Sequence, residues 1–154
     1  MFTLGVISDT HGLLRPEATN ALIGSDAIVH AGDVGRPEIL EHLATLAPLT
    51  AVRGNVDVKS WAESLPIAAT AEFRGTQVFV IHDRGDLARY PVPPGTNIVI
   101  FGHSHKALAE WRDDGVLWFN PGSAGPRRFR LPATVGLIRV RGVGVEPEIL
   151  TLLP

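Results

Sequence analysis

The stretch TLGVISDTHG (residues 3–12) decides the fold, because a short apolar run ends abruptly in polar residues and a glycine. The same pattern occurs twice more: AIVH (27–30) runs into AGDVG, and LTAV (49–52) runs into RGNVD. Continuous apolar runs of this length are typical of strands that are buried on both faces of a parallel sheet. We therefore expect three buried strands in the first half of the chain.

Helix-like segments separate these strands. RPEATNALIG (15–24) carries Pro16 near its start and closes on Gly24, and RPEILEHLATLA (36–47) carries Pro37 at the equivalent position. The order strand, helix, strand, helix, strand indicates the first half of an α/β sheet.

The second half of the chain has the patterns of hairpins. A turn at Gly75 and another at Asp114–Gly115 each lie between candidate strands, and residues 134–152 resemble a final strand pair. NIVIFGHSH (97–105) contains one more buried strand. The sequence predicts a mixed sheet, or two packed sheets, flanked by helices within a single domain over residues 1–154.

Composition limits the classes of protein that need to be considered. The formal net charge of -2 gives no argument for a broad nucleic-acid or membrane surface, and no apolar stretch approaches the roughly 18 residues that cross a bilayer. Cysteine is absent, which excludes disulfides and thiolate metal sites. The N-terminus is predicted to be a first strand and not a signal peptide, so we expect a cytoplasmic protein.

Five expected strands are each followed by side chains that can bind metal ions. Oxygen and imidazole ligands together suit Mn²⁺, iron, Zn²⁺, Co²⁺ or Ni²⁺. Any one of these motifs is explained as well by an ordinary turn, but five in register at strand ends are not. Seven ligands exceed what one ion can use, so two metals with a shared carboxylate are the economical interpretation. The candidate ligands are Asp9, His11, Asp33, Asn55, His82, His103 and His105.

The residues around these ligands fit a tightly built site. Glycines at 12, 32, 54 and 102 flank the ligands, where the backbone must turn sharply or approach an ion closely. His103 and His105 are two residues apart, and in extended backbone such side chains share a face. We expect each of these histidines to reach a different one of two neighbouring cations.

The motifs DTHG, AGD, RGNVD and GHSH, followed by NPGS (120–123), together resemble the calcineurin-like metallophosphoesterase superfamily. The ordered set is similar to that of its small branch of bacterial and archaeal phosphodiesterases. This resemblance implies a four-layer α/β/β/α sandwich of two mixed β-sheets flanked by helices. It also implies a dinuclear centre of two divalent transition-metal ions per chain, most simply Mn²⁺, in which a metal-bridging hydroxide attacks a phosphodiester in line.

The resemblance also assigns the ligands. One ion would be held by Asp9, His11, Asp33 and His105. Asp33 would bridge to the second ion, which Asn55, His82 and His103 would also hold. Asp33, Asn55 and His103 are the expected catalytic residues among them.

Two positions depart from the pattern of relatives. Val56 stands where many relatives carry a histidine that protonates the leaving group, which favours phosphodiesters or activated esters over ordinary monoesters. Asp83 replaces a glycine after His82; its charge could repel an anionic substrate, but we expect its side chain to point outwards. Asp57, Arg127 and Arg128 are candidate contacts for a small phosphodiester or nucleotide-like substrate.

Other residues have expected supporting roles, and a second function suits the same fold. His30 is expected to pack in the core or behind the ligands, and Asn120 and Ser123 to brace the histidine loops. The alternative function is a non-catalytic protein-interaction scaffold with the same fold, such as the retromer's metallophosphoesterase-like subunit. The presence of all seven ligand positions favours the enzyme. Nucleic acid is a poor candidate partner, and exposed strand edges or tryptophans would suit a homo-oligomer.

Overall fold

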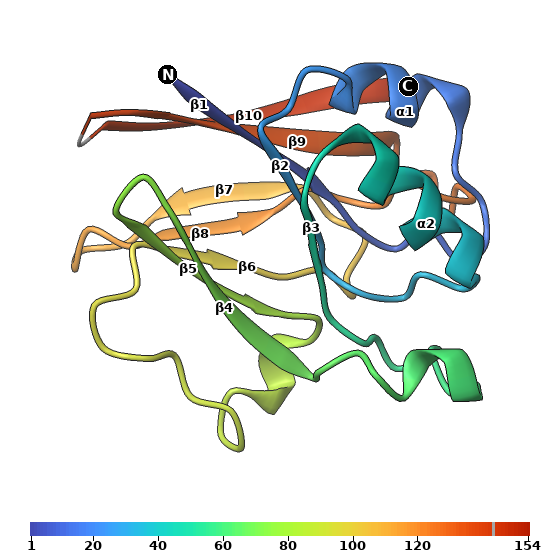
Figure 1. Cartoon of the computed structure of the whole chain (residues 1–154), viewed down its shortest axis with the longest axis horizontal. Helices are drawn as coiled ribbons and strands as arrows, with labels where there is room; N and C mark the ends of the chain where they lie inside the picture. Colours follow the sequence, from blue (N-terminus) through green and yellow to red (C-terminus); the bar gives the residue numbers. More distant parts are fainter. Residues whose placement is uncertain (143) are drawn as a thin grey trace.

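The computed structural model describes residues 1–142 and 144–154, and in them ten strands form two five-stranded sheets (Figure 1). The first sheet has the spatial order β10 (Gly144–Leu153), β9 (Ala133–Arg141), β1 (Phe2–Ile7), β2 (Ala27–His30) and β3 (Leu49–Ala51). The second sheet has the order β4 (Ala68–Phe73), β5 (Thr76–Ile81), β6 (Ile98–Ile100), β8 (Leu117–Asn120) and β7 (Leu108–Trp111).

Each sheet has a parallel centre and antiparallel additions. In the first sheet β1, β2 and β3 are parallel, whereas β9 pairs antiparallel with both β1 and β10. In the second sheet β5, β6 and β8 are parallel, and β4 and β7 are antiparallel edge strands. Consequently the carboxyl ends of the central strands of one sheet lie at one edge of that sheet.

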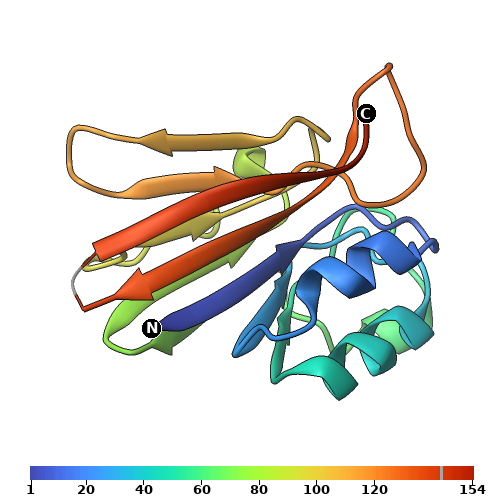
Figure 2. The same cartoon turned by 90° about the horizontal axis from the view of Figure 1, so that it is seen from above.

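The two predicted α-helices are confirmed and lie on the same side of the first sheet (Figure 2). They are α1 (Pro16–Leu22) and α2 (Pro37–Leu46), each with its proline in the first turn. A proline there suits a helix start because its missing N–H has no helical partner in any case. Two short 3₁₀ helices, η1 (Ser60–Ala62) and η2 (Arg84–Asp86), follow in the loops.

Alternating side chains of each strand enter different apolar layers. Val6 on β1 and Val80 on β5 face the layer between the two sheets, which both sheets share. Ile7 and Ile28 face the layer between the first sheet and the helices. The two sheets therefore share one apolar core layer.

The layer on the outer face of the second sheet, where the predicted sandwich has its second set of helices, is thin. Phe79 and Trp118 on the outer face of the second sheet pack with Leu87 and Val92 from the loop that follows η2, and no α-helix lies there in the described residues. Three prolines between residues 91 and 94 end any helix in this segment. The predicted α/β sandwich of two mixed sheets is therefore confirmed, with its second helical layer reduced to a 3₁₀ turn and a loop.

The predicted hairpins are confirmed and one predicted strand differs. β4 and β5 join through Arg74 and Gly75, which both have positive φ, and β7 and β8 join at Gly115. β9 and β10 form the final strand pair, whose turn includes residue 143, outside the described residues. β3 was expected to be buried on both faces, but it is a half-buried edge strand because the sheet ends there.

Candidate metal centre

The structure brings all seven candidate ligands together at one place. Five of the strands that precede them, β1, β2, β3, β5 and β6, are parallel members of their sheets, so their carboxyl ends deliver these residues to adjoining edges. Both sheets contribute to each of the two groups of side chains described below.

The first group joins Asp9 and His11, after β1, to His105, after β6. His105 Nε2 lies 3.3 Å from Asp9 Oδ1 and 3.2 Å from His11 Nε2. His11 Nε2 lies 3.6 Å from the same Asp9 oxygen. Two ring nitrogens and one carboxylate oxygen thus face a common point.

The second group joins Asp33, His82 and His103, with Asn55 beside them. His82 Nε2 lies 3.1 Å from Asp33 Oδ2 and 3.1 Å from Asn55 Oδ1. The same Asn55 oxygen is 3.2 Å from His103 Nδ1. The second set of donors therefore also faces a common point.

Asp33 stands between the two groups. Its Oδ2 atom lies 3.1 Å from His82 Nε2 in the second group and 3.6 Å from His11 Nε2 in the first. Its other oxygen, Oδ1, accepts the backbone N–H of Val56 at 3.0 Å, which fixes the carboxylate plane. A carboxylate in this position could contact ions in both groups.

The backbone of the site is unusual. Five of the seven candidate ligands have positive φ, a conformation that costs free energy for residues other than glycine and tends to cluster at functional sites. The five are Asp9 (φ 56°), His11 (47°), Asp33 (56°), His103 (73°) and His105 (63°).

This left-handed conformation differs from the extended backbone that the sequence predicts around His103 and His105. His103 and His105 do belong to different groups, as expected, but the backbone around them is left-handed and not extended. Their separation therefore results from a tight loop, which a period-two argument does not describe.

Two glycines let this loop and its neighbour approach the ligands closely. A Cβ atom at Gly54 would collide with the backbone N and Oδ1 of Asp33. A Cβ atom at Gly102 would collide with the side chains of Ser8 and Asp9. These two glycines are required by close packing, as the sequence predicted.

The donor set fits divalent transition metals. His82 Nδ1 donates to the carbonyl oxygen of Ala31 at 2.7 Å, so a neutral ring presents the lone pair of Nε2 to the second group. Asp9 Oδ1 is buried and makes no hydrogen bond within the described residues, although three imidazole nitrogens lie within 3.9 Å of it. A cation shared by these atoms would satisfy both features.

The pKa shifts of the two carboxylate ligands also favour the binding of cations. Burial would raise the pKa of Asp9, but the imidazoles of His105 and His11 outweigh burial and hold that pKa well below its usual range. Burial would also raise the pKa of Asp33, yet His82 lowers it overall. In turn, burial would lower the pKa of His82, and Asp33 raises it overall. Both carboxyls are therefore anionic at neutral pH, the state that binds cations.

Comparison with known proteins identifies the family. The model of the calcineurin-like phosphoesterase superfamily domain matches residues 2–142, nearly the whole chain. The chain belongs to the calcineurin-like phosphoesterase superfamily. It is 35% identical to a probable metallophosphoesterase of Methanothermobacter thermautotrophicus, over 96% of this chain and 91% of that protein.

Several solved structures share the fold of this chain. A structure described as a novel archaeal phosphodiesterase covers 97% of this chain and all of its own length, with a TM-score of 0.76 and 23% identity. Vps29 of Chaetomium thermophilum covers 99% of this chain and 97% of its own, with a TM-score of 0.78 and 18% identity. Enzymes and vacuolar sorting proteins therefore share this phosphoesterase fold. Within residues 1–142 and 144–154, no helix has the length and apolarity needed to cross a bilayer.

Around the phosphoesterase site, several residues support the ligand loops. His30 is buried, and its Nδ1 accepts the backbone N–H of Gly32 at 3.1 Å. Thr10 Oγ1 donates to the carbonyl of Val34 at 2.8 Å and so accepts from His30 Nε2 at 3.0 Å. Burial lowers the pKa of His30 to about 4. His30 is thus a neutral residue behind the ligands, as predicted.

Asp57 requires a correction. It was a candidate substrate contact, but its side chain is buried and accepts three backbone N–H groups, from Val34, Gly35 and Gly54, at 3.1, 3.0 and 2.9 Å. Both carboxylate oxygens are occupied by the loops that carry Asp33 and Asn55. Asp57 therefore positions those loops and is not placed to touch substrate.

Asn120 and Ser123 brace the site, though not the same loop. Asn120 Nδ2 donates to Gly102 O and Ser104 Oγ, both at 3.2 Å, and so holds the histidine loop as predicted. Ser123 Oγ donates to the backbone carbonyl of Asp9 at 3.0 Å and therefore supports the first ligand loop instead. Ser8 was not anticipated, and its hydroxyl donates to Asp9 Oδ2 at 2.6 Å.

Asp83 does not simply point outwards. Its Oδ1 accepts the backbone N–H of Gly85 at 2.8 Å, which caps η2, and its Oδ2 lies 3.7 Å from His103 Nε2. The exposed left-handed loop places His103 within its reach instead.

The arginine candidates lie on a loop whose first residues, Ala124 and Gly125, make hydrogen bonds beside the candidate ligands. Arg15 donates to Gly125 O at 3.1 Å, and Ala124 N donates to Ser8 O at 3.0 Å. Arg127 and Arg128 follow within three residues and are exposed. Their contact with substrate stays a prediction.

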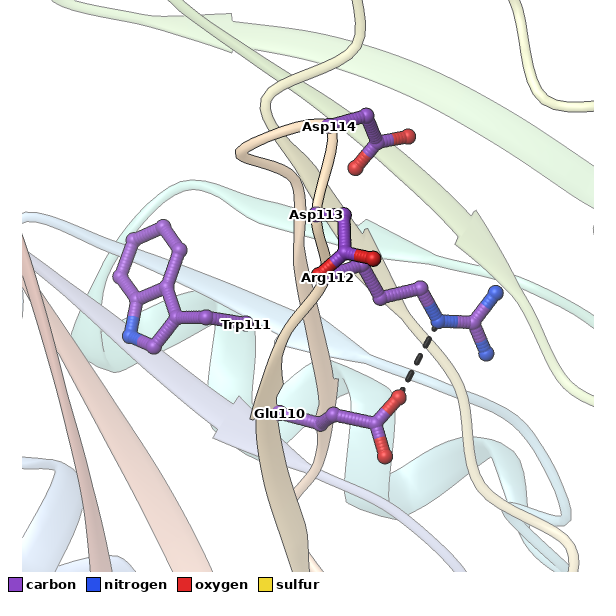
Figure 3. A pocket seen from close by; sticks show the side chains of 5 residues that line it. All are labelled: Glu110, Trp111, Arg112, Asp113 and Asp114. Atoms are coloured by element: carbon purple, nitrogen blue, oxygen red, sulfur yellow. Dashed lines mark hydrogen bonds and ion pairs between the residues drawn. The ribbon is translucent and has the colours of Figure 1, made fainter.

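A surface hollow of about 550 Å³ lies elsewhere (Figure 3). It is formed by the β7–β8 hairpin, where Arg112 pairs with Glu110 at 3.1 Å and stacks over Trp118. None of the seven candidate ligands lines it. An open hollow on one hairpin, lined by none of the candidate ligands, is a poor candidate for the reaction site.

Proposed function

We propose that this phosphoesterase is a metal-dependent phosphodiesterase with a dinuclear centre. The observation that carries the proposal is the pair of adjoining histidine–carboxylate groups that share Asp33 Oδ2, at 3.1 Å from His82 Nε2 and 3.6 Å from His11 Nε2. Two divalent cations bound there would supply a hydroxide nucleophile at neutral pH and offset the charge that develops on the phosphoryl oxygens.

The seven ligands take the following roles in this proposal. Asp33 serves both ions, and a carboxylate suits that task better than a neutral amide. Asn55 tempers the negative charge of the second site, and His103, whose side chain is 47% exposed, lies where substrate arrives. Asp33, Asn55 and His103 are the catalytic residues. One ion would be held by Asp9, His11, Asp33 and His105, and the other by Asp33, Asn55, His82 and His103.

The substrate follows from what the chain lacks at one position. Val56 is 45% exposed beside the second group and cannot donate a proton to a leaving group. An ester whose leaving group departs without protonation, such as an aryl phosphodiester, is therefore favoured over an alkyl ester. Arg127 and Arg128 would contact the phosphate of a small phosphodiester or nucleotide-like molecule. Mn²⁺ is the proposed metal, although Fe, Zn²⁺, Co²⁺ and Ni²⁺ suit the same donors.

The alternative is a protein-interaction scaffold, a hypothesis to which the structural likeness to Vps29 gives weight. The complete set of ligands, held in a strained backbone, favours the enzyme because a scaffold has no use for that strain.

The test combines metal content with turnover. The protein is stripped of metal, reloaded with Mn²⁺ and assayed with bis-p-nitrophenyl phosphate and p-nitrophenyl phosphate. We expect about two ions per chain and faster turnover of the diester. His103→Ala should lose turnover, and His42→Ala, on the exposed face of α2, should keep it. A folded protein that binds no metal and hydrolyses neither ester would leave the scaffold hypothesis.

A further inference from the structure

Asp83 makes two different contacts with its two carboxylate oxygens. Oδ1 accepts the N–H of Gly85 at 2.8 Å and caps η2. Oδ2 lies 3.7 Å from Nε2 of His103. The cap alone needs only one oxygen, so the second oxygen is available for a separate role.

His103 has a polar neighbour at each end of its ring. Nδ1 faces the second group of ligands, 3.2 Å from Asn55 Oδ1, and Nε2 faces Asp83. The backbone N–H of His103 donates to Asp9 Oδ2 at 3.2 Å. A carboxylate on the far nitrogen fixes the ring and strengthens the near nitrogen as a donor to a cation.

The pair lies at the mouth of the site. The side chains of His103 and Asp83 are 47% and 38% exposed, so an arriving anion meets the Asp83 charge before it is desolvated. Two divalent cations beside the carboxylates of Asp9 and Asp33, together with one bound hydroxide, would leave a formal charge of plus one, and Asp83 would lower it to zero. The lost positive charge weakens the attraction for a dianionic monoester about twice as much as for a monoanionic diester, because the interaction scales with the charge of the substrate.

We propose that Asp83 is a positioning residue that orients His103 and sets the preference of the site for monoanionic phosphodiesters over dianionic monoesters. The inference rests on the proposed function and adds its charge selectivity. A glycine at this position, as the resemblance gives for relatives, has neither the charge nor the contact.

Asp83→Asn is the informative variant. It keeps an oxygen that can cap η2 and removes the negative charge. Asp86→Asn is the matched control, because Asp86 is exposed on the same 3₁₀ helix and has the same charge. Asp83→Glu restores the charge in a longer side chain.

The first measurement compares kcat/KM for p-nitrophenyl phosphate with kcat/KM for bis-p-nitrophenyl phosphate, at pH 8 in the Mn²⁺-loaded protein. The two esters have the same leaving group. Asp83→Asn should raise the ratio of monoester to diester by roughly five- to tenfold. Asp86→Asn should leave the ratio within about twofold, and Asp83→Glu should return it toward the wild-type value. An unchanged ratio in Asp83→Asn overturns the charge selectivity while the phosphodiesterase stands.

The second measurement does not depend on turnover. Calorimetric titration of metal-free protein with Mn²⁺ should show the weaker of two sites lose about tenfold in affinity in Asp83→Asn and not in Asp86→Asn. Wild-type protein that hydrolyses neither ester but shows this difference would remove the proposed function and keep the positioning role. Equal affinities in both variants overturn the positioning role.

Discussion

The carboxylate of Asp57 accepts the backbone N–H of Gly54 at 2.9 Å and so ties the loop that carries Asn55 to the interior. The same carboxylate accepts two N–H groups from the loop after Asp33. One buried side chain therefore sets the spacing of two loops that reach the second group of ligands. This arrangement determines which substitutions will disturb the site without touching it.

Asp57→Asn is expected to lower the free energy of unfolding by about 2–3 kcal/mol, because the amide keeps one acceptor and turns N–H donors toward the backbone N–H groups. Urea denaturation of the metal-free protein measures the change. Asp113→Asn, on the exposed β7–β8 turn, serves as the control and should shift stability by less than about 0.5 kcal/mol. Equal stabilities of the two variants would contradict the bracing role.

His30 should make the stability of the metal-free protein depend on pH. Its pKa falls from 6.5 to about 4 on folding because the ring is buried, so the unfolded chain binds the proton first as pH drops. The contribution is fully present above pH 6.5 and is lost between there and about pH 4. By pH 5 the loss relative to His30→Gln should be on the order of 2 kcal/mol.

The measurement for His30 is the difference between wild type and His30→Gln in urea midpoints from pH 7.5 to 5. Comparison with the variant removes the contribution that carboxyl groups make to the pH dependence of stability, because those groups titrate in both proteins. His42→Gln, on the exposed face of α2, should follow the wild-type curve. A wild-type curve that runs parallel to His30→Gln would show that the ring is not kept neutral by burial.

Removal of metal should destabilise the fold. Ligands bound only by the native state add about 2.7 kcal/mol per site at 100 times Kd, which corresponds to a rise in Tm of roughly 5–10 °C for a chain of this size with one site occupied. Thermal unfolding before and after EDTA treatment, and after Mn²⁺ is returned, measures the shift. His105→Ala should show a smaller response than Lys106→Ala, whose side chain is exposed beside it. The same Tm with and without metal would argue against both groups as metal sites.

Val56→His should extend the range of leaving groups. A histidine at this exposed position beside Asp33 could protonate a poor leaving group, an effect worth at least roughly tenfold and often more. The measurement is kcat for methyl p-nitrophenyl phosphate against a dialkyl diester. We expect the gain to be confined to the dialkyl ester, whereas Val56→Gln should give none. Equal gains for both esters would show that proton donation is not what Val56 lacks.

Much of this architecture could be predicted from the sequence because its signals are local. Apolar runs and turn residues predict β1, β2 and the hairpins at Gly75 and Gly115, and those depend on neighbouring residues alone. The half-burial of β3 could not be predicted, since it depends on which strand lies at the edge of the sheet.

Part of the candidate site could likewise be predicted from local sequence, and part of it could not. Residue type and position after strands were enough to nominate the seven ligands, whereas the left-handed backbone of His103 and His105 arises from packing of the loop against Ser8 and Asp9. The bracing role of Asp57 depends on a contact with residues more than 20 positions away, which no local pattern encodes.

Each group of candidate ligands draws side chains from both sheets: Asp9 and His11 come from the first sheet and His105 from the second. Neither sheet alone holds a complete set of donors. A bound ion would therefore link the two sheets at a place where apolar packing and a few hydrogen bonds, such as that from His82 Nδ1 to the carbonyl of Ala31, already join them. Any motion that slid one sheet along the other would open both sites at once, so the precision of the chemistry and the mechanical rigidity of the sandwich would rest on the same few atoms.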